Sequence, residues 1–256
     1  MAARASGATG DASRPWQTLS AGFERARARE DSLDRLVEWP AQRELLGDVT
    51  GLAVLDAGCG NGAKVAQLAS EGASVAVGVD ISGNFIETPP GVELIQADLS
   101  DLAAVPGLAG RRFDRILFLQ SFGYAKDPVR ALQVARSMLT DDGYILLTRT
   151  QPIRYALERA EQNGTTVGEE YFSTARFSYK HRNWDDQVTL TKRPYTMSDL
   201  LNTFSTAGLW IEKAVEPQMS PEAAERYPEK YASMNKRLVG ILMFKLRPIP
   251  GLDADH

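Results

Sequence analysis

The nine residues from Val54 to Gly62 constrain the fold of this chain more than any other stretch. An apolar run ends in the acid Asp56, and the alternate residues Gly58, Gly60 and Gly62 follow. A helical pattern of apolar residues starts directly behind the last glycine. Glycines let a backbone come close to a ligand, and a helix N-terminus offers unpaired N–H groups to an anion. The stretch therefore predicts a strand, a tight turn and a helix that together bind a nucleotide.

This turn has two interpretations. Two of the glycines and Ala63 fit the G-x-G-x-x-A fingerprint of dinucleotide-binding Rossmann enzymes, which would make the protein an NAD-dependent oxidoreductase. The sequence Leu-Asp-Ala-Gly-Cys-Gly-Asn-Gly over 55–62 closely resembles the first motif of class I S-adenosylmethionine (SAM)-dependent methyltransferases. Asp56 favours the second interpretation, because a carboxylate two residues before the first glycine would repel a pyrophosphate but suits the ammonium group of a methionine.

After the glycine turn, strand patterns alternate with helical patterns. Besides the strand before the turn, runs typical of buried strands cover 74–80, 92–97, 113–120, 144–148, 209–215 and 238–246. Asp141–Gly143 should form a turn, and only a short helix over 81–87 fits before the pair Pro89–Pro90. The alternation predicts an α/β fold with a doubly wound, mainly parallel, Rossmann-like sheet of seven strands. The resemblance covers about 50–150 and 195–246, and it implies that the last strand is antiparallel.

These patterns predict one domain over residues 16–247, which the resemblance implies is a methyltransferase domain, between a disordered N-terminus (1–15) and a C-terminal tail (248–256). Its expected parts are N-terminal helices over 16–48, a SAM-binding core over 50–150, a substrate-cap insertion over 151–195 and the C-terminal part of the sheet over 196–247. Helices ahead of the first strand commonly cover the cofactor site in this family. Packing on the sheet alone would explain them equally well.

The resemblance also implies the residues that hold the donor, SAM, and its product S-adenosylhomocysteine. Asp80 would accept the ribose hydroxyls, and Ile81 would pack on the adenine face. Asp98 would take the adenine amino group, the backbone of Leu99 would meet the ring, and Gln120 would lie at the methionine end. The full set of cofactor-binding residues is Asp56, Gly58, Cys59, Gly60, Gly62, Asp80, Ile81, Asp98, Leu99 and Gln120.

The acceptor should be bound by the insertion over 151–195. It follows the carboxyl end of a strand, where open α/β sheets bind ligands. A helix after Pro152 and a hairpin over 177–191 fit its residue pattern. The aromatic residues expected to line an acceptor pocket are Tyr124, Tyr171, Tyr179 and Trp184. Those within the insertion fit the core of a cap, or contacts in a homodimer formed through the 165–192 hairpin, equally well.

The sulfonium of SAM already activates its methyl group, so the main task of the protein is to position an acceptor in line and exclude water. A hydroxyl acceptor also needs a base. The chain has two histidines, and His256 is the last residue. His181 is therefore the only plausible histidine base, and Tyr124, just beyond the strand over 113–120, is the second candidate catalytic residue. His181 lies between two basic residues, so a surface position explains it as well.

Composition limits the partners. The net charge of −4 and the lack of a basic block disfavour a nucleic-acid partner. No apolar stretch is long enough to cross a membrane, and the N-terminus lacks a hydrophobic signal core, so we expect a cytoplasmic protein. Cys59 is the only cysteine, and residues 148–151 do not contain the acid-plus-amide pair of magnesium-dependent catechol methyltransferases. No metal is expected.

The C-terminal part of the sequence indicates a particular group of methyltransferases. An Arg193-Pro194 pair precedes the capped helix that starts after Thr196, and a later strand ends in Glu216-Pro217. This arrangement resembles bacterial small-molecule methyltransferases. We therefore predict a SAM-dependent methyltransferase that acts on an oxygen or nitrogen of a small metabolite, in a biosynthetic pathway. The alternative is a SAM-binding regulatory or assembly protein without catalysis.

Overall fold

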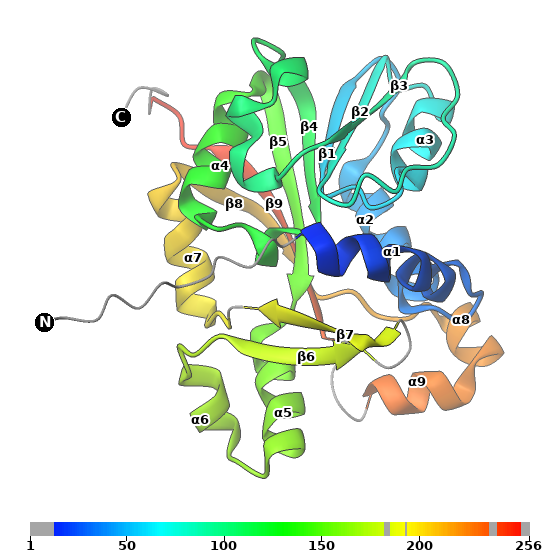
Figure 1. Ribbon diagram of the computed structural model, residues 1–256, viewed down its shortest axis with the longest axis vertical. Coiled ribbons are helices and arrows are strands. Elements are labelled where there is room, and N and C mark those ends of the chain that lie inside the picture. The colour runs from blue at the N-terminus through cyan, green and yellow to red at the C-terminus, as the bar shows by residue number, and fades with distance from the viewer. Residues whose placement is uncertain (1–12, 182–184, 193, 236–239, 252–256) are drawn as a thin grey trace, which may run out of the picture.

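The computed structural model describes residues 13–181, 185–192, 194–235 and 240–251. Within these ranges, one sheet of seven strands runs through the molecule, and a two-stranded hairpin lies apart from it (Figure 1). The order across the large sheet is β3-β2-β1-β4-β5-β9-β8. Its strands are β1 (Ala53–Ala57), β2 (Val75–Asp80), β3 (Val92–Gln96), β4 (Phe113–Leu119), β5 (Leu139–Thr150), β8 (Leu209–Val215) and β9 (Ile241–Pro248).

The first five strands pair in parallel, and β9 is antiparallel to both of its neighbours, β5 and β8. The chain winds outward in one direction from β1 to β3 and in the other from β4 onward. Ligands of open α/β sheets bind at the carboxyl ends of the strands near such a reversal. The predicted doubly wound, mainly parallel sheet with an antiparallel last strand is confirmed.

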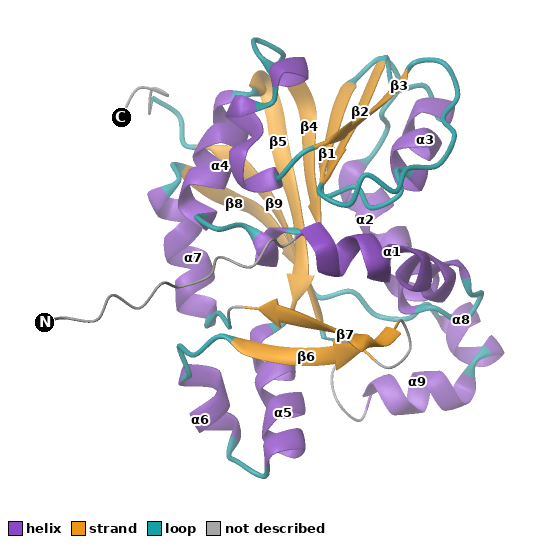
Figure 2. Ribbon diagram, in the orientation of Figure 1, coloured by secondary structure: helices purple, strands orange, loops and turns teal. Residues whose placement is uncertain are grey.

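Successive side chains of β1 divide the core into two layers, because they alternate across the sheet. Val54 is packed in a cluster with residues of α2 (Trp39–Leu46) and α3 (Ala63–Ser70). Leu55 is packed in a cluster with residues of α4 (Pro128–Ser137) and α7 (Met197–Thr206). Figure 2 shows these helices on opposite faces of the sheet. The buried run that precedes the glycines is thus a central strand covered on both sides.

The N-terminal segment forms α1 (Ser13–Ala28), the π-helical turn η1 (Asp34–Glu38) and α2. The Tyr144 hydroxyl in β5 lies within hydrogen-bonding distance of the last carbonyl oxygens of α2, those of Leu45 (3.0 Å) and Leu46 (2.9 Å). This contact fixes α2 against the sheet. α1 lies in front of the carboxyl ends of the central strands, beside the hairpin strand β7 (Asp185–Lys192) (Figure 1).

The insertion after β5 contains α5 (Pro152–Asn163), α6 (Val167–Phe172) and an antiparallel hairpin of β6 (Phe177–His181) and β7. A Thr196–Asp199 capping box then starts α7, as its sequence predicts. A second excursion forms α8 (Pro221–Arg226) and α9 (Pro228–Asn235). It is joined to the end of α1 by ion pairs from Arg226 to Glu30 and from Lys230 to Asp31.

Two local predictions are wrong. The segment 81–87 is not helical, because hydrogen bonds hold it against the glycine turn, including one from the Ile86 amide to the Asn61 carbonyl oxygen (2.9 Å). The predicted turn Asp141–Gly143 lies inside β5, which starts at Leu139 and pairs irregularly with β4 there. Short 3₁₀ segments lie in the connections that follow β3 and β4: η2 (Leu99–Ala104), η3 (Pro106–Leu108) and η4 (Phe122–Tyr124).

Candidate functional site

The glycine turn is held at the carboxyl end of β1 by its neighbours. The amides of Gly58 and Cys59 both donate to the Val79 carbonyl oxygen, at 2.7 and 3.0 Å. Gly58 has a φ of +93°, and a Cβ on it would lie only 2.2 Å from the Cβ of Ser121. Only glycine fits there, for reasons of backbone conformation and of space. Burial raises the pKa of the Cys59 thiol, so Cys59 is an inert, packed residue of the turn.

Asp80, at the end of β2, organises the same turn. Its Oδ2 accepts a hydrogen bond from the Gly60 amide (2.9 Å), and its Oδ1 accepts from the amide (2.9 Å) and hydroxyl (2.7 Å) of Ser82. Ile81 follows directly, half-buried beside the turn. The structure therefore brings the predicted ribose-binding acid into contact with the predicted glycine loop, across 20 residues of sequence.

Asp98 lies after β3 and caps η2 by accepting from the Ser100 amide (2.9 Å). Its Oδ2 forms an ion pair with Lys126 at 2.8 Å. Burial acts to raise the pKa of Asp98, but the hydrogen bonds from Lys126 and Ser100 outweigh it, and the pKa falls below its usual range. A Leu99 Cδ2 atom lies 3.4 Å from the position of a Gly58 Cβ, which places this third strand end next to the turn.

Asp56 is the least satisfied acid of the site. It is 2% exposed, and its Oδ1 has no hydrogen-bond partner within the described part of the chain. Burial raises its pKa from 3.8 to about 7, against the opposing effect of the cations Lys64 and Arg27. A buried carboxylate without a donor costs free energy, which a cationic ligand would recover.

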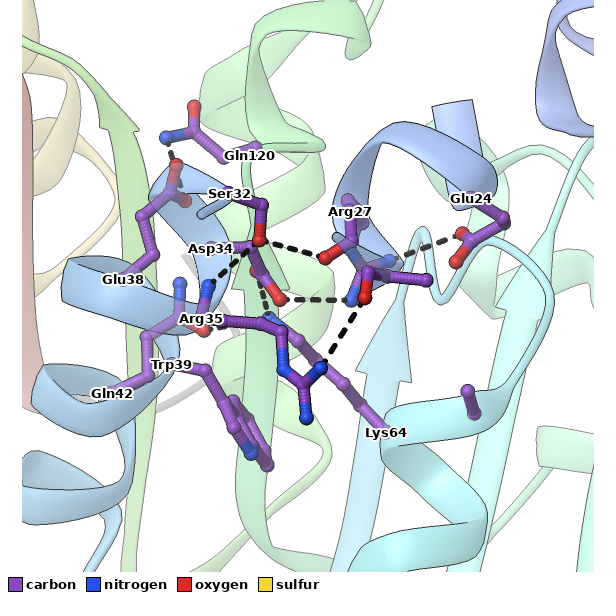
Figure 3. A network of polar contacts seen from close by, with 12 residues as sticks. Glu24, Arg27, Ser32, Asp34, Arg35, Glu38, Trp39, Gln42, Lys64 and Gln120 are labelled. Carbon is purple, nitrogen blue, oxygen red and sulfur yellow. Dashed lines mark hydrogen bonds and ion pairs between the residues drawn. The ribbon is translucent and has the colours of Figure 1, made fainter. Parts of the chain in front are cut away.

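The helix α1 covers the glycine turn. A Cβ on Gly60 would lie 3.0 Å from Glu24 Oε1 and 3.9 Å from Arg27 Nη1. These two side chains form an ion pair at 3.1 Å (Figure 3). Burial raises the pKa of Glu24 although Arg27 acts to lower it. Polar side chains of the N-terminal helix therefore face the turn.

A buried polar network connects the N-terminal helices to the sheet, and Figure 3 shows it. Lys64, directly behind the glycines, binds Asp34 (2.7 Å) and the Gln42 side-chain oxygen (2.9 Å). Gln42 donates onward to the Thr148 hydroxyl in β5 (3.3 Å). Burial lowers the pKa of Lys64, while Asp34 acts to raise it. Sequence analysis missed these residues, because no local pattern shows that they meet.

Gln120 marks the end of β4 and has an unusual backbone. Its φ of +62° is the one positive φ among non-glycine residues in the described ranges. Its amide donates to the Thr148 carbonyl oxygen (3.0 Å), and its Nε2 donates to Glu38 Oε2 (3.2 Å). Burial raises the pKa of Glu38. Left-handed backbone at a side chain of this size is strained and concentrates at functional sites.

A cavity opens beside Gln120, at the carboxyl ends of β4 and β5. The empty volume at this position, which includes solvent at the open mouth of the cavity, is about 430 Å³. Its lining is aromatic and basic, and it consists of Gln120, Gly123, Arg149, Thr150, Pro152, Tyr155 and Tyr195. The cavity therefore lies between the end of the donor site and the first helix of the insertion.

The tyrosines predicted to line the acceptor pocket lie in three different parts of the structure. Tyr124 lies in η4 and packs edge-on against Trp16 of α1, with ring centroids 5.2 Å apart. The Tyr171 hydroxyl accepts from the Met197 amide (2.9 Å), which joins α6 to α7 and leaves Tyr171 outside the cavity lining. Tyr179 pairs through its backbone with Leu190 in the hairpin, and its side chain lies outside the described atoms.

His181 ends β6, where its backbone pairs with Asp185. Its side chain, like the whole of Trp184, lies outside the described part of the structure. In the ranges that are described, no group of three or more His, Cys, Asp or Glu side chains is arranged to hold a metal ion. Over the same ranges no helix has the length and apolar character needed to cross a membrane.

A methyltransferase domain family matches residues 23–206, which is most of the chain and includes the carboxyl ends of β1 to β5. The chain belongs to this methyltransferase family. The match ends with α7, so it spans the glycine turn, the cavity and the insertion.

Curated relatives are distant. A protein of Haemophilus influenzae, described only as uncharacterized, is 23% identical over 216 residues, which is 78% of this chain and 84% of the relative. The tRNA U34 carboxymethyltransferase of Aeromonas hydrophila is 27% identical over 122 residues, which is 43% of this chain. That match spans only 36% of the carboxymethyltransferase.

Solved structures share the fold of this methyltransferase. A putative SAM-dependent methyltransferase from Listeria monocytogenes is 20% identical, with a TM-score of 0.67 over 90% of this chain and 98% of the other. A SAM-dependent methyltransferase from Mesorhizobium loti is 21% identical, with a TM-score of 0.63 over 82% and 97%. The fold is that of SAM-dependent methyltransferases, in agreement with the cofactor predicted from the sequence.

Proposed function

We propose that this methyltransferase transfers the methyl group of SAM to an oxygen or nitrogen of a small metabolite. The observation that carries the proposal is the meeting of three strand ends. The glycine turn, Asp80 and Asp98 come together beside a cavity lined by aromatic and basic side chains. Strand ends of this kind hold a nucleotide-like ligand, and the cavity beside them is the position that we assign to a second molecule.

The residues present fit SAM. The partnerless Oδ1 of the buried Asp56 suits the donor's ammonium group, and the backbone at Gly60 gives the close approach that a ligand needs. A carboxylate has about four lone-pair sites, and the described hydrogen bonds occupy three of those on Asp80. Asp80 can therefore still accept a hydrogen bond from a hydroxyl group. When bound, SAM supplies an electrophilic methyl group on a positively charged sulfur.

The chain's own contribution is to position the acceptor. Gln120 links the donor side to the cavity, and Arg149, Tyr155 and Tyr195 supply its polar and aromatic walls. α1 and the β6–β7 hairpin lie over the same edge of the sheet, where they would exclude water (Figure 1). Orientation and water exclusion can supply much of the rate enhancement for a transfer whose electrophile is already activated.

Base catalysis is a separate part of the proposal. His181 is proposed as the base for a hydroxyl acceptor, with Tyr124 as an orienting hydroxyl beside the donor site. The test compares the pH–rate profile of the His181→Ala variant with that of the parent protein. Turnover that stays near normal, with an unchanged profile, would leave positioning alone as the mechanism.

The hairpin over 165–192 is also proposed as a homodimer contact. Phe172 of α6, 73% exposed in this segment, is the side chain that a second copy would cover. Light scattering of the Phe172→Ser variant tests it. A dimer that becomes a monomer supports the contact, and an unchanged mass contradicts it.

The assay for the function incubates purified protein with methyl-labelled SAM and two substrate pools, a small-metabolite extract and bulk tRNA. We expect label in the small-molecule fraction and none in tRNA, since the net charge is −4. The Asp80→Ala variant is the negative control. Labelled tRNA would favour a nucleic-acid acceptor, as in the carboxymethyltransferase relatives. SAM binding without label transfer to either pool would favour a regulatory protein.

A further inference from the structure

Arg149 places a cation inside the cavity without a matching anion. It lies next to the end of β5, between Thr148 and Thr150. Its Nη1 is buried and has no hydrogen-bond partner, and no carboxylate within the described residues forms an ion pair with it. Most of the other half-buried arginines in the described ranges pair with a carboxylate, among them Arg27, Arg43 and Arg154. Arg159, for example, pairs with Glu170 at 2.5 Å.

Aromatic rings surround this guanidinium instead. Its Cζ lies 4.2 Å from the centre of the Tyr195 ring, and Tyr155 lines the same cavity. Burial lowers the pKa of Arg149, against the opposing effect of Tyr195 and Tyr155. Arginine nevertheless stays protonated in proteins. A cation–π contact contributes about 0.5–2 kcal/mol, which is less than the several kcal/mol that desolvation of an ion costs.

The residue opposite Arg149 leaves the guanidinium accessible from the cavity. Gly123 lies next to it, and a Cβ there would be 3.7 Å from Nη2, at ordinary contact distance. Because Gly123 has no side chain, that side of the fork is open to a ligand. A planar guanidinium binds carboxylate and phosphate groups through two parallel hydrogen bonds.

We propose that Arg149 binds an anionic group, a carboxylate or a phosphate, on the acceptor molecule. This inference rests on the proposed function, because it assigns the cavity beside the donor site to the acceptor. The donor's own carboxylate has another cation available. Arg27 of α1, which also pairs with Glu24 and Asp34, has its Nη1 3.9 Å from the position of a Gly60 Cβ, at the glycine turn. The acceptor is therefore an acidic metabolite that presents its anion to β5 and its nucleophilic atom toward Gln120.

The direct test measures binding rather than turnover. Protein saturated with S-adenosylhomocysteine is titrated with benzoate, phenyl phosphate and the neutral analogue benzamide, and binding is followed by ligand-detected NMR. The aromatic probes suit the tyrosine walls. We expect one of the anions to bind at least about tenfold more tightly than benzamide, as one charge-assisted hydrogen bond can provide. The preferred anion distinguishes a carboxylate from a phosphate.

Three variants make the test specific. Arg149→Gln should abolish the anion preference, and Arg149→Lys should retain part of it, because lysine keeps the charge without the fork. Arg130→Gln removes the same charge from the exposed surface of α4 and should change nothing. The fold of Arg149→Gln is checked by thermal unfolding. Its melting temperature should change little, because the loss of the contact with Tyr195 and the removal of a buried charge without an anion oppose each other.

Several outcomes overturn the inference. Equal affinity for anionic and neutral probes, or a preference that survives in Arg149→Gln, removes the anion site. A tenfold loss of S-adenosylhomocysteine affinity in Arg149→Gln would assign the residue to the donor instead. If the parent protein binds neither SAM nor S-adenosylhomocysteine, the proposed function fails. Anion binding at Arg149 in such a protein would then not be binding of a methyl acceptor.

Discussion

The Asp80 carboxylate accepts a hydrogen bond from the backbone amide of Gly60 at 2.9 Å, and this contact joins the end of β2 to the glycine turn after β1. With its other oxygen, Asp80 holds the Ser82 amide and hydroxyl. One acid therefore fixes two loops of the donor site. A glycine turn and an acid about 20 residues further on also occur together in dinucleotide-binding folds.

Gly58→Ala should destabilise the protein strongly, because the new Cβ would lie 2.2 Å from the Ser121 Cβ in a position with φ of +93°. Gly91→Ala is the matched control, with a φ of +89° and no atom within 4 Å of the new Cβ. We expect Gly91→Ala to lower the free energy of unfolding by about 1–2 kcal/mol from backbone strain alone. Gly58→Ala should lose clearly more in urea denaturation. Equal losses would show that Ser121 moves aside freely.

Asp56 should make stability depend on pH. Its pKa is raised by burial from 3.8 to about 7, so the folded protein keeps a proton that the unfolded chain has lost. The free energy of unfolding from this group therefore falls as pH rises from about 4 to about 7, and stays constant above. Asp56→Asn removes the effect, and its stability relative to the parent should rise by on the order of a few kcal/mol across that window. Urea denaturation at both ends of the window measures it. A constant difference would contradict the raised pKa.

The left-handed backbone of Gln120 gives a prediction about side-chain shape. Gln120→Val should cost about 1–3 kcal/mol, because a β-branched residue tolerates a φ of +62° poorly and also loses the bond to Glu38. Asparagine tolerates this conformation better, so Gln120→Asn should lose less stability. Thermal unfolding of the two variants compares them. A valine variant as stable as the asparagine variant would show that this backbone relaxes.

The donor half of the site could be predicted from the sequence because its signals are local. Asp56 and the glycines lie within one turn, and Asp80 and Asp98 each end a strand pattern. The geometry of consecutive parallel strands then brings them to one edge. The absence of a helix over 81–87 was missed, since bonds to Asp80 and to the Asn61 carbonyl oxygen override local propensity.

The acceptor half could not be predicted in the same way. Arg149 is a charged residue at a strand end in the sequence, and its burial depends on Tyr195 and on α5, which pack against it in three dimensions. The positive φ of Gln120 leaves no sequence signature. Lys64 and Asp34 come from different helices and meet only through tertiary packing. The aromatic residues of the insertion predicted that Tyr171 lines the acceptor pocket, but its hydroxyl instead accepts from the first residue of α7 and joins α6 to α7.

The measurement that tests the central claim most directly is a calorimetric titration of the protein with SAM and, separately, with NAD. We expect SAM to bind and NAD not to bind. Asp80→Ala should weaken SAM binding by about a hundredfold, since hydrogen bonds to a charged group contribute about 1.5–3 kcal/mol each. Asp141→Ala, an exposed acid at the opposite end of β5, should bind SAM like the parent. Tight NAD binding without SAM binding, or unchanged SAM affinity in Asp80→Ala, would contradict this account.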